Sequence, residues 1–213
     1  MKIIEPSKMS YTKTTQHLLP EVETAMKEDS SISHVHFENV QELVQASKID
    51  FCYGAFSNSL LLNGAFSGVS FSDIICNNCD FSNTHFDNCS FVRVQFINCK
   101  LVGCHFTNNY FSHIQFQQCN NCYSNFSFAT IKDTIFSDTN LTNANIQQVI
   151  LKQVKWQRCN LKRINLFQTN LKGMDFSDCY LEGLLVSLDD IKGATFSSLQ
   201  ALELSKLMGI IIK

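Results

Sequence analysis

Hydrophobic residues recur at every fifth position along most of this chain. From Phe51 to Phe196 in steps of five, every residue is apolar except Asn121. These centre positions hold all but three of the 18 phenylalanines. Neither a helix, with a period near 3.6, nor a strand, with a period of 2, produces this spacing. The pattern therefore predicts a structural repeat.

A second set of apolar or small residues lies two positions before each centre. These small inward positions run from Ile49 to Ala194, and only Asn109 and Asp189 are neither apolar nor small. The other residues of each repeat are mostly Ser, Asn, Asp, Thr, Gln and Lys. A chain that turns inward every five residues would close a square coil of about twenty residues, and stacked coils would pair at strand spacing. We therefore expect an all-β solenoid.

Two segments, TNLTNANIQQ (139–148) and TNLKGMDFSDCYLEGL (169–184), resemble the repeat of the pentapeptide-repeat family, A(D/N)LXX with Leu or Phe at the centre. The resemblance covers residues 49–196. It implies a right-handed quadrilateral β-helix with a short C-terminal α-helix. We accordingly predict an N-terminal cap or arm at 1–48, the β-helix at 49–196, and a helix with a short strand for dimerisation at 197–213.

The motif CNNC occurs at 76–79 and at 119–122, and alone it suggests a zinc site. In a coil of twenty, however, the two copies lie two coils apart, about 9.6 Å at strand spacing. One zinc ion needs its sulfur ligands about 2.3 Å away. We therefore predict no metal and no cofactor, and a buried core ladder instead. Its members are Phe71, Phe91, Phe111, Cys79, Cys99, Cys119, Cys159 and Cys179.

Composition limits the possible functions. The formal net charge of −2 does not favour direct binding of nucleic acid. We see no signal peptide and no membrane-spanning run, so ten cysteines suggest reduced thiols in the cytoplasm. No Ser-His-Asp set, glycine-rich phosphate loop or HExxH motif is found, so we expect no enzyme activity.

The C-terminal segment predicts a helix. Ser197 and Gln200 have the spacing of a capping box, and Gly209 is a plausible helix end. Its apolar residues are too widely distributed to face only the last coil, and Ile210–Ile212 could form a short strand. We predict a homodimer through Leu199, Leu202, Leu204, Leu207, Met208 and Ile210. A cap on a monomer is the alternative.

The uninterrupted repeat and the ending QA, a Leu-rich helix and LMGIII resemble the quinolone-resistance (Qnr-like) branch of the family, in its loop-free chromosomal form. This resemblance implies dimeric rods that mimic DNA, bind DNA gyrase and topoisomerase IV, and protect them from quinolones. Acidic residues on the rod would then contact the topoisomerase. The candidates are Asp73, Asp80, Asp87, Asp133 and Asp138.

The charge pattern leaves alternatives open. A DNA mimic should carry a sustained negative face, yet residues 151–172 contain six cations and no acid. The chain could instead be a scaffold or an immunity protein with another protein partner, or could bind nucleic acid through these cations. We also expect a local bulge at Asn121, the one polar centre.

Overall fold

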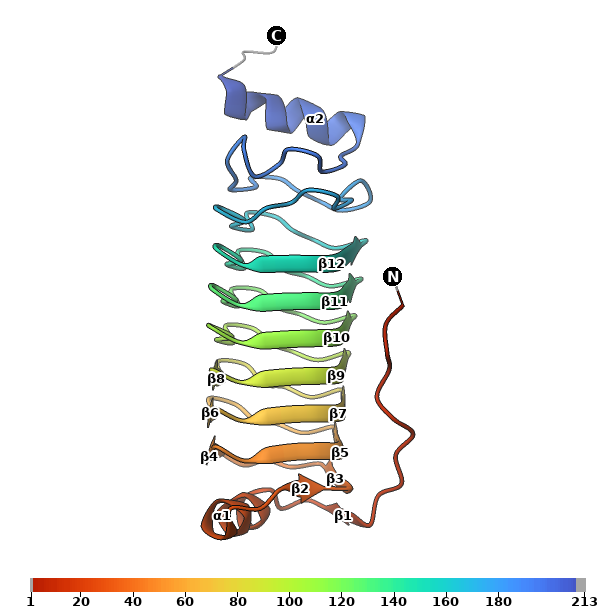
Figure 1. The fold of residues 1–213 in the computed structure, drawn as a ribbon, viewed down its shortest axis with the longest axis vertical. Coiled ribbons are helices and arrows are strands. Elements are labelled where there is room, and N and C mark those ends of the chain that lie inside the picture. The colour runs from red at the N-terminus through yellow and green to blue at the C-terminus, as the bar shows by residue number, and fades with distance from the viewer. Residues whose placement is uncertain (1, 210–213) are drawn as a thin grey trace.

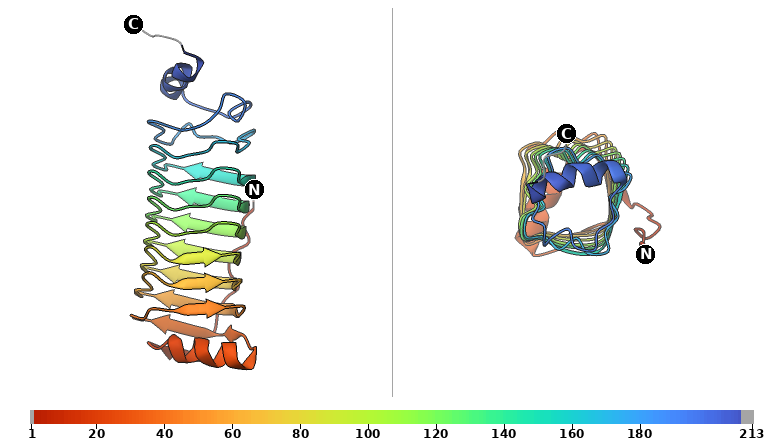
Figure 2. Two further views of the ribbon diagram at one scale, coloured as in Figure 1. Left: turned by 90° about the vertical axis from the view of Figure 1, so that its left-hand side faces the viewer. Right: turned by 90° about the horizontal axis from the view of Figure 1, so that it is seen from above.

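The computed structural model describes residues 2–209, which form a four-sided rod of stacked coils (Figure 1) with a square outline when viewed end on (Figure 2). Corresponding residues are twenty apart, so that Phe71 pairs with Phe91 and Phe91 with Phe111, always in parallel. The predicted all-β, right-handed quadrilateral solenoid is confirmed. The long strands are β5 (Asp50–Ser57), β7 (Ser70–Asn77), β9 (Ser90–Ile97), β10 (Tyr110–Gln117), β11 (Thr130–Ser137) and β12 (Ile150–Gln157). A smaller sheet contains β4 (Gln45–Ser47), β6 (Ala65–Ser67) and β8 (His85–Asp87).

Stacked aromatic rings fill the interior of the rod. The ring centroids of Phe71, Phe91 and Phe111 are 4.9 Å apart from one coil to the next, with nearly parallel planes. Rings on adjacent faces meet edge to face, as Phe86 and Phe91 do at 5.6 Å. Both geometries are favourable for aromatic pairs. The five-residue spacing of Phe therefore produces one continuous hydrophobic core.

Most corners of the coils use a left-handed backbone. Two residues after a centre position the φ angle is positive, for example at Asn78 (55°), Asn98 (51°) and Asn143 (57°). Asn, Asp and Gly tolerate this region better than other residues do. The corners therefore explain why so many of the outward positions are Asn.

The residue just before a centre position selects the local shape of the face. Asn140 Oδ1 accepts a hydrogen bond from the N–H of Thr142 at 3.1 Å, and Asn160 Oδ1 accepts one from Lys162 at 3.1 Å. This is the turn that Asn and Asp side chains favour. Where Thr130 or Ile150 occupies the same position, the chain remains an extended strand.

The small inward positions supply hydrogen-bond donors as well as small volume. The thiol of Cys119 donates to the carbonyl of Phe96 at 3.2 Å, and the hydroxyl of Thr139 donates to that of Phe116 at 3.1 Å, each acceptor lying one coil below. Burial raises the pKa of Cys89 to about 11. That thiol is therefore protonated at neutral pH, whereas a zinc ligand is a thiolate.

The stacked, paired strands of the solenoid begin one coil earlier than the boundary that we predicted after residue 48. Strands β2 (Ile32–Ser33) and β3 (Val35–Glu38) pair with β5, and β1 (Lys13–Thr15) pairs with β3. The partners Phe37 and Phe56 are 19 residues apart, whereas Ala46 and Phe66 are 20 apart. This first coil is one residue shorter than the others. Its inward residues therefore do not lie on the five-residue series that begins at Phe51.

Helices close both ends of the rod (Figure 1). Helix α1 (Leu19–Glu28) buries Val22 and Ala25 at the first coil. Helix α2 (Ser198–Ser205) begins with the predicted capping box and continues as the short 3₁₀ turn η1 (Lys206–Met208). The side chain of Gln200 also donates to the carbonyls of Phe176 (2.8 Å) and Cys179 (2.7 Å), and so ties α2 to the last coils.

Asn121 does not create the bulge that we expected. Its N–H donates to Asn140 O at 2.7 Å, as the N–H of Leu101 does to Asn120 O at 2.7 Å one coil below. Its side chain is fully buried, and neither Oδ1 nor Nδ2 has a hydrogen-bond partner. The backbone register holds because it depends on inter-coil hydrogen bonds. The defect is therefore an unpaired polar group in an apolar column.

Replacing Asn121 with leucine should stabilise the protein by about 1–3 kcal/mol, because it removes a buried amide that makes no hydrogen bond. Leu101 and Leu141 occupy the positions directly below and above, so a leucine fits the stack. Urea unfolding measures the change. The matched control, Leu101→Asn, should destabilise the protein. An unchanged or lower stability for Asn121→Leu would contradict this interpretation.

Candidate interaction surfaces

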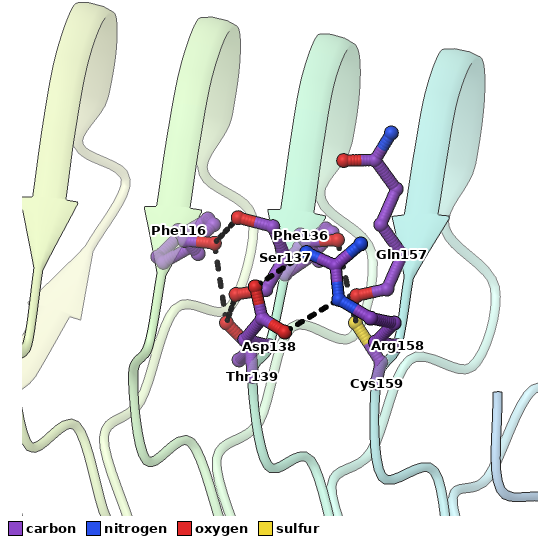
Figure 3. Close-up of polar contacts among 8 residues, drawn as sticks. All are labelled: Phe116, Phe136, Ser137, Asp138, Thr139, Gln157, Arg158 and Cys159. Carbon is purple, nitrogen blue, oxygen red and sulfur yellow. Dashed lines mark hydrogen bonds and ion pairs between the residues drawn. The ribbon is translucent and has the colours of Figure 1, made fainter. Parts of the chain in front are cut away.

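Three acidic residues on the rod pair with a cation one coil above. Asp138 forms two hydrogen bonds of 2.7 Å with Arg158, twenty residues later, as Figure 3 shows. Asp80 lies 3.6 Å from Lys100 across the same interval. The twenty-residue register therefore compensates negative charge locally, which reduces any extended acidic face.

The third such pair, Asp73 and Arg93, is covered by the N-terminal segment. Arg93 Nη2 lies 2.6 Å from Asp73 Oδ2, and the N–H and hydroxyl of Ser7 donate to Asp73 Oδ1 at 2.9 and 3.0 Å. The segment continues along the rod (Figure 1) and brings the N–H of Ile4 within 3.4 Å of His113 Nδ1. Asp73 is fully buried. The folded-back segment thus shields the carboxylate from a partner, and the contact of Asp73 with a topoisomerase stays a prediction.

The remaining predicted contacts are accessible to different degrees. Asp87 is exposed and Asp133 is half-buried, and within residues 2–209 neither forms an ion pair. Asp80 and Asp138 share their charge with the cations above them. Asp87 and Asp133 are thus the uncompensated acids among the predicted contact residues.

The helix at the C-terminal end presents apolar side chains to solvent. Leu199 is 77% exposed, Leu202 50% and Met208 63%. Leu207 is also exposed, and Leu204 is half-buried. Most of the apolar surface of α2 is therefore not covered by the rod. The remaining predicted interface residue, Ile210, and the predicted strand at 210–212 lie outside the described residues.

The predicted absence of a metal site can be compared with the arrangement of possible ligands in the described residues. Across residues 2–209, no three His, Cys, Asp or Glu side chains lie close enough to hold a metal ion. In the second CNNC, Cys119 is buried and Cys122 is partly exposed, whereas both cysteines of the first copy, Cys76 and Cys79, are buried. Neither helix in the described chain is long and apolar enough to cross a membrane.

This architecture defines a parallel, four-sided β-solenoid whose repeat unit is five residues. Residues 69–146 and 89–166 match the family model described as "Pentapeptide repeat region". Residues 69–166 are thus similar to the pentapeptide-repeat family, in agreement with the fold. No curated protein matches the sequence.

Solved structures with the same architecture include a trypsin-treated variant of QnrB1, a plasmid-mediated fluoroquinolone resistance protein. It is 18% identical with a TM-score of 0.52, over 85% of this chain and 99% of that one. HetL, a pentapeptide repeat protein involved in heterocyst differentiation regulation in the cyanobacterium Nostoc sp. strain PCC 7120, is 13% identical with a TM-score of 0.26. That match covers 84% of this chain and 97% of that one. At 18% identity, the likeness to the QnrB1 structure is one of fold.

The buried Asp73 predicts a pH-dependent anchor for the N-terminal segment. Burial alone would raise the pKa of Asp73, but hydrogen bonds from Arg93 and Ser7 outweigh it, and the pKa is lowered. The stabilisation is therefore complete above the ordinary carboxyl pKa, about 3.9, and is lost as the pH falls through the lower folded-state value.

Asp73→Asn should reduce the free energy of unfolding at pH 7 by about 1.5–3 kcal/mol, the range for hydrogen bonds to charged groups. Asn tolerates the left-handed backbone at this position, where φ is 55°. Trypsin should also cleave the variant faster after Lys2 and Lys8, because the N-terminal segment would no longer be held on the rod. Asp87→Asn is the control, since this acid is exposed. Equal cleavage and equal stability of the two variants would contradict the anchor.

Proposed function

We propose that this protein is a non-enzymatic, cytoplasmic homodimer that binds DNA gyrase or topoisomerase IV and protects it from quinolones. The observation that carries the proposal is a solenoid fold shared with a fluoroquinolone resistance protein over 99% of that protein's chain. The Qnr-like C-terminal sequence, with its exposed leucines, supports the same function. No catalytic step is involved, because binding to the enzyme would itself exclude drug or DNA.

The mimicry of DNA would rest on shape more than on charge. The rod is straight and unbranched (Figure 1), so it could occupy a groove built for a duplex. Its acids are largely neutralised, as Asp138 is by Arg158. We therefore assign the electrostatic part of the contact mainly to Asp87 and Asp133, with Asp80 and Asp138 contributing less.

Dimerisation would extend the rod through α2. An exposed leucine such as Leu199 loses unfavourable contact with water when a second copy covers it, at about 25 cal/mol per Å² of apolar surface. Gln200 holds α2 on the last coils, so that the helix is already placed for docking. The dimer would then carry two arms that point away from a central seam.

A supercoiling assay tests the function. Purified protein added to gyrase with ciprofloxacin should restore supercoiling at intermediate concentrations. The double variant Asp87→Asn/Asp133→Asn should require at least about tenfold more protein, corresponding to roughly 1.4 kcal/mol of binding energy. Asp50→Asn, another exposed acid, is the control. Neither rescue nor inhibition with gyrase or topoisomerase IV would reject the proposal.

Light scattering tests the dimer. Leu202→Glu with Leu207→Glu should convert dimers to monomers, because each half of the interface would then bury unpaired charge. The unfolding temperature of the rod should change little, since neither side chain is buried in a single chain. A dimeric variant, or a monomeric unmodified protein, would contradict the assigned interface.

The alternative is a scaffold or immunity protein with a different protein partner. The near-neutral surface favours it, because paired columns such as Asp80 with Lys100 leave little sustained negative field. A pull-down that retains other proteins and no topoisomerase would support this function.

A further inference from the structure

The stack of backbone hydrogen bonds is interrupted between β12 and residues 170–178, which we call the seam. One coil below, the N–H of Ile150 donates to Ala129 O at 3.0 Å and that of Asp138 donates to Gln157 O at 2.9 Å. The repeat would pair Asn170 N with Val149 O and Arg158 N with Ser177 O. Neither bond forms, although residues 148–178 are all described.

Two more inter-coil bonds are missing along the same seam. On another face, the N–H of Phe86 donates to His105 O at 2.8 Å, but the bond from the same position of the five-residue repeat, Trp156 N to Asp175 O, is absent. A bond from Asp175 N to Val154 O is absent as well. On the other side, Phe176 N and Thr195 N bond normally between residues 170–178 and the coil above. The upper edge of β12 therefore makes none of these backbone bonds, although Trp156 and Phe176 still stack across it with ring centroids 5.8 Å apart.

The sequence accounts for the seam. In β12 the residues before the centres are Ile150 and Lys155, and the chain is extended. One coil above, the same positions hold Asn170 and Asp175, whose side chains accept the N–H groups of Lys172 and Ser177 at 2.9 Å and form turns. Both faces therefore change from strand to turn in one step.

The seam is open and partly apolar. A cavity of about 690 Å³ lies between residues 148–151 and residues 168–172. A second cavity, of about 380 Å³, lies between residues 154–157 and residues 173–178. Ile150 is 54% exposed and Leu151 is only half-buried, whereas the equivalent Ile131 is 1% exposed. The indole N–H of Trp156, which lines the second cavity, has no hydrogen-bond partner.

Cations flank the first cavity. Lys152 and Lys172 are twenty residues apart and belong to one column, and Lys172 lines the cavity itself. Within residues 2–209 neither lysine forms an ion pair. Both are exposed. An extended peptide that added to this edge would thus meet free backbone groups, an apolar floor and unneutralised positive charge.

We propose that the seam is a docking site for an extended, acidic segment of a partner protein, which adds as a β-strand to the upper edge of β12. Its backbone pairs with the groups that the coil above leaves free, as in other complexes formed by strand addition. An apolar side chain covers Ile150 and Leu151, and a carboxylate lies between Lys152 and Lys172. The proposal is independent of topoisomerase binding.

The full-length protein itself reports on this site, because Trp156 is its only tryptophan. The probe is a synthetic peptide, acetyl-Thr-Val-Glu-Ile-Glu-Val-Thr-amide, followed by tryptophan fluorescence and by calorimetry. We expect saturable binding with a one-to-one stoichiometry and a shifted emission. The same peptide with N-methylated backbone amides should bind at least about tenfold more weakly. Equal binding of both peptides, or no binding of either, would overturn the proposal.

Two variants locate the binding. Asn170→Ile/Asp175→Lys gives the upper coil the residues found at the same positions in β12, so it should close the seam and abolish binding. Lys152→Gln/Lys172→Gln leaves the backbone unchanged and should weaken binding at least about tenfold. Its matched control is Lys132→Gln/Lys27→Gln. Unchanged peptide affinity in Lys152→Gln/Lys172→Gln would overturn the proposal.

A further competitor separates protein from nucleic acid as the partner. A duplex oligonucleotide should not displace the peptide at an ionic strength near 0.15 M, where exposed charges are screened beyond about 8 Å. Displacement by the duplex, with loss of duplex binding in Lys152→Gln/Lys172→Gln, would assign the site to nucleic acid and overturn the peptide assignment.

Discussion

The hydrogen bonds that join each coil to the next determine most of what this chain presents to its surroundings. They fix residues twenty apart as direct neighbours, as Phe71 and Phe91 are. Rings then stack on rings, thiols donate to carbonyls of the coil below, and Asp138 meets Arg158. No single stacked pair needs to be strong, because the same contact recurs along the rod.

The same register sets the charge of the surface. A carboxylate whose column neighbour is a cation contributes little to the distant field, because the two charges cancel within a few ångströms. Asp73 illustrates the extreme case, since Arg93 and Ser7 enclose it completely. A partner of this rod would therefore recognise its straight shape, its apolar end at α2 and a few uncompensated groups. This is consistent with our proposal of topoisomerase binding through shape.

Much of the fold could be predicted from the five-residue period, which defines both inward sets, the coil length and the placement of Cys119 in the core. The first coil could not, because its residues are one short of twenty and Phe37 leaves the step. The covering of Asp73 by Ser7 joins residues 66 positions apart outside any repeat. The sequence does contain a sign of the seam, because Ile150 is replaced by Asn170 one coil above. This sign can be interpreted only with the structural finding that Asn at this position forms a turn.

Amide hydrogen exchange, followed residue by residue by NMR, is the most direct test of the claim that inter-coil bonding continues up to β12 and is interrupted at its upper edge. An amide that is hydrogen-bonded between coils exchanges only when the coil opens, which should be rare. An amide at an unbonded edge exchanges without such opening. The amides of Trp156 and Arg158 should exchange at least about tenfold faster than those of Phe86 and Asp138, which bond to the coil above at 2.8 and 2.9 Å. Equal protection of the two pairs would contradict the account.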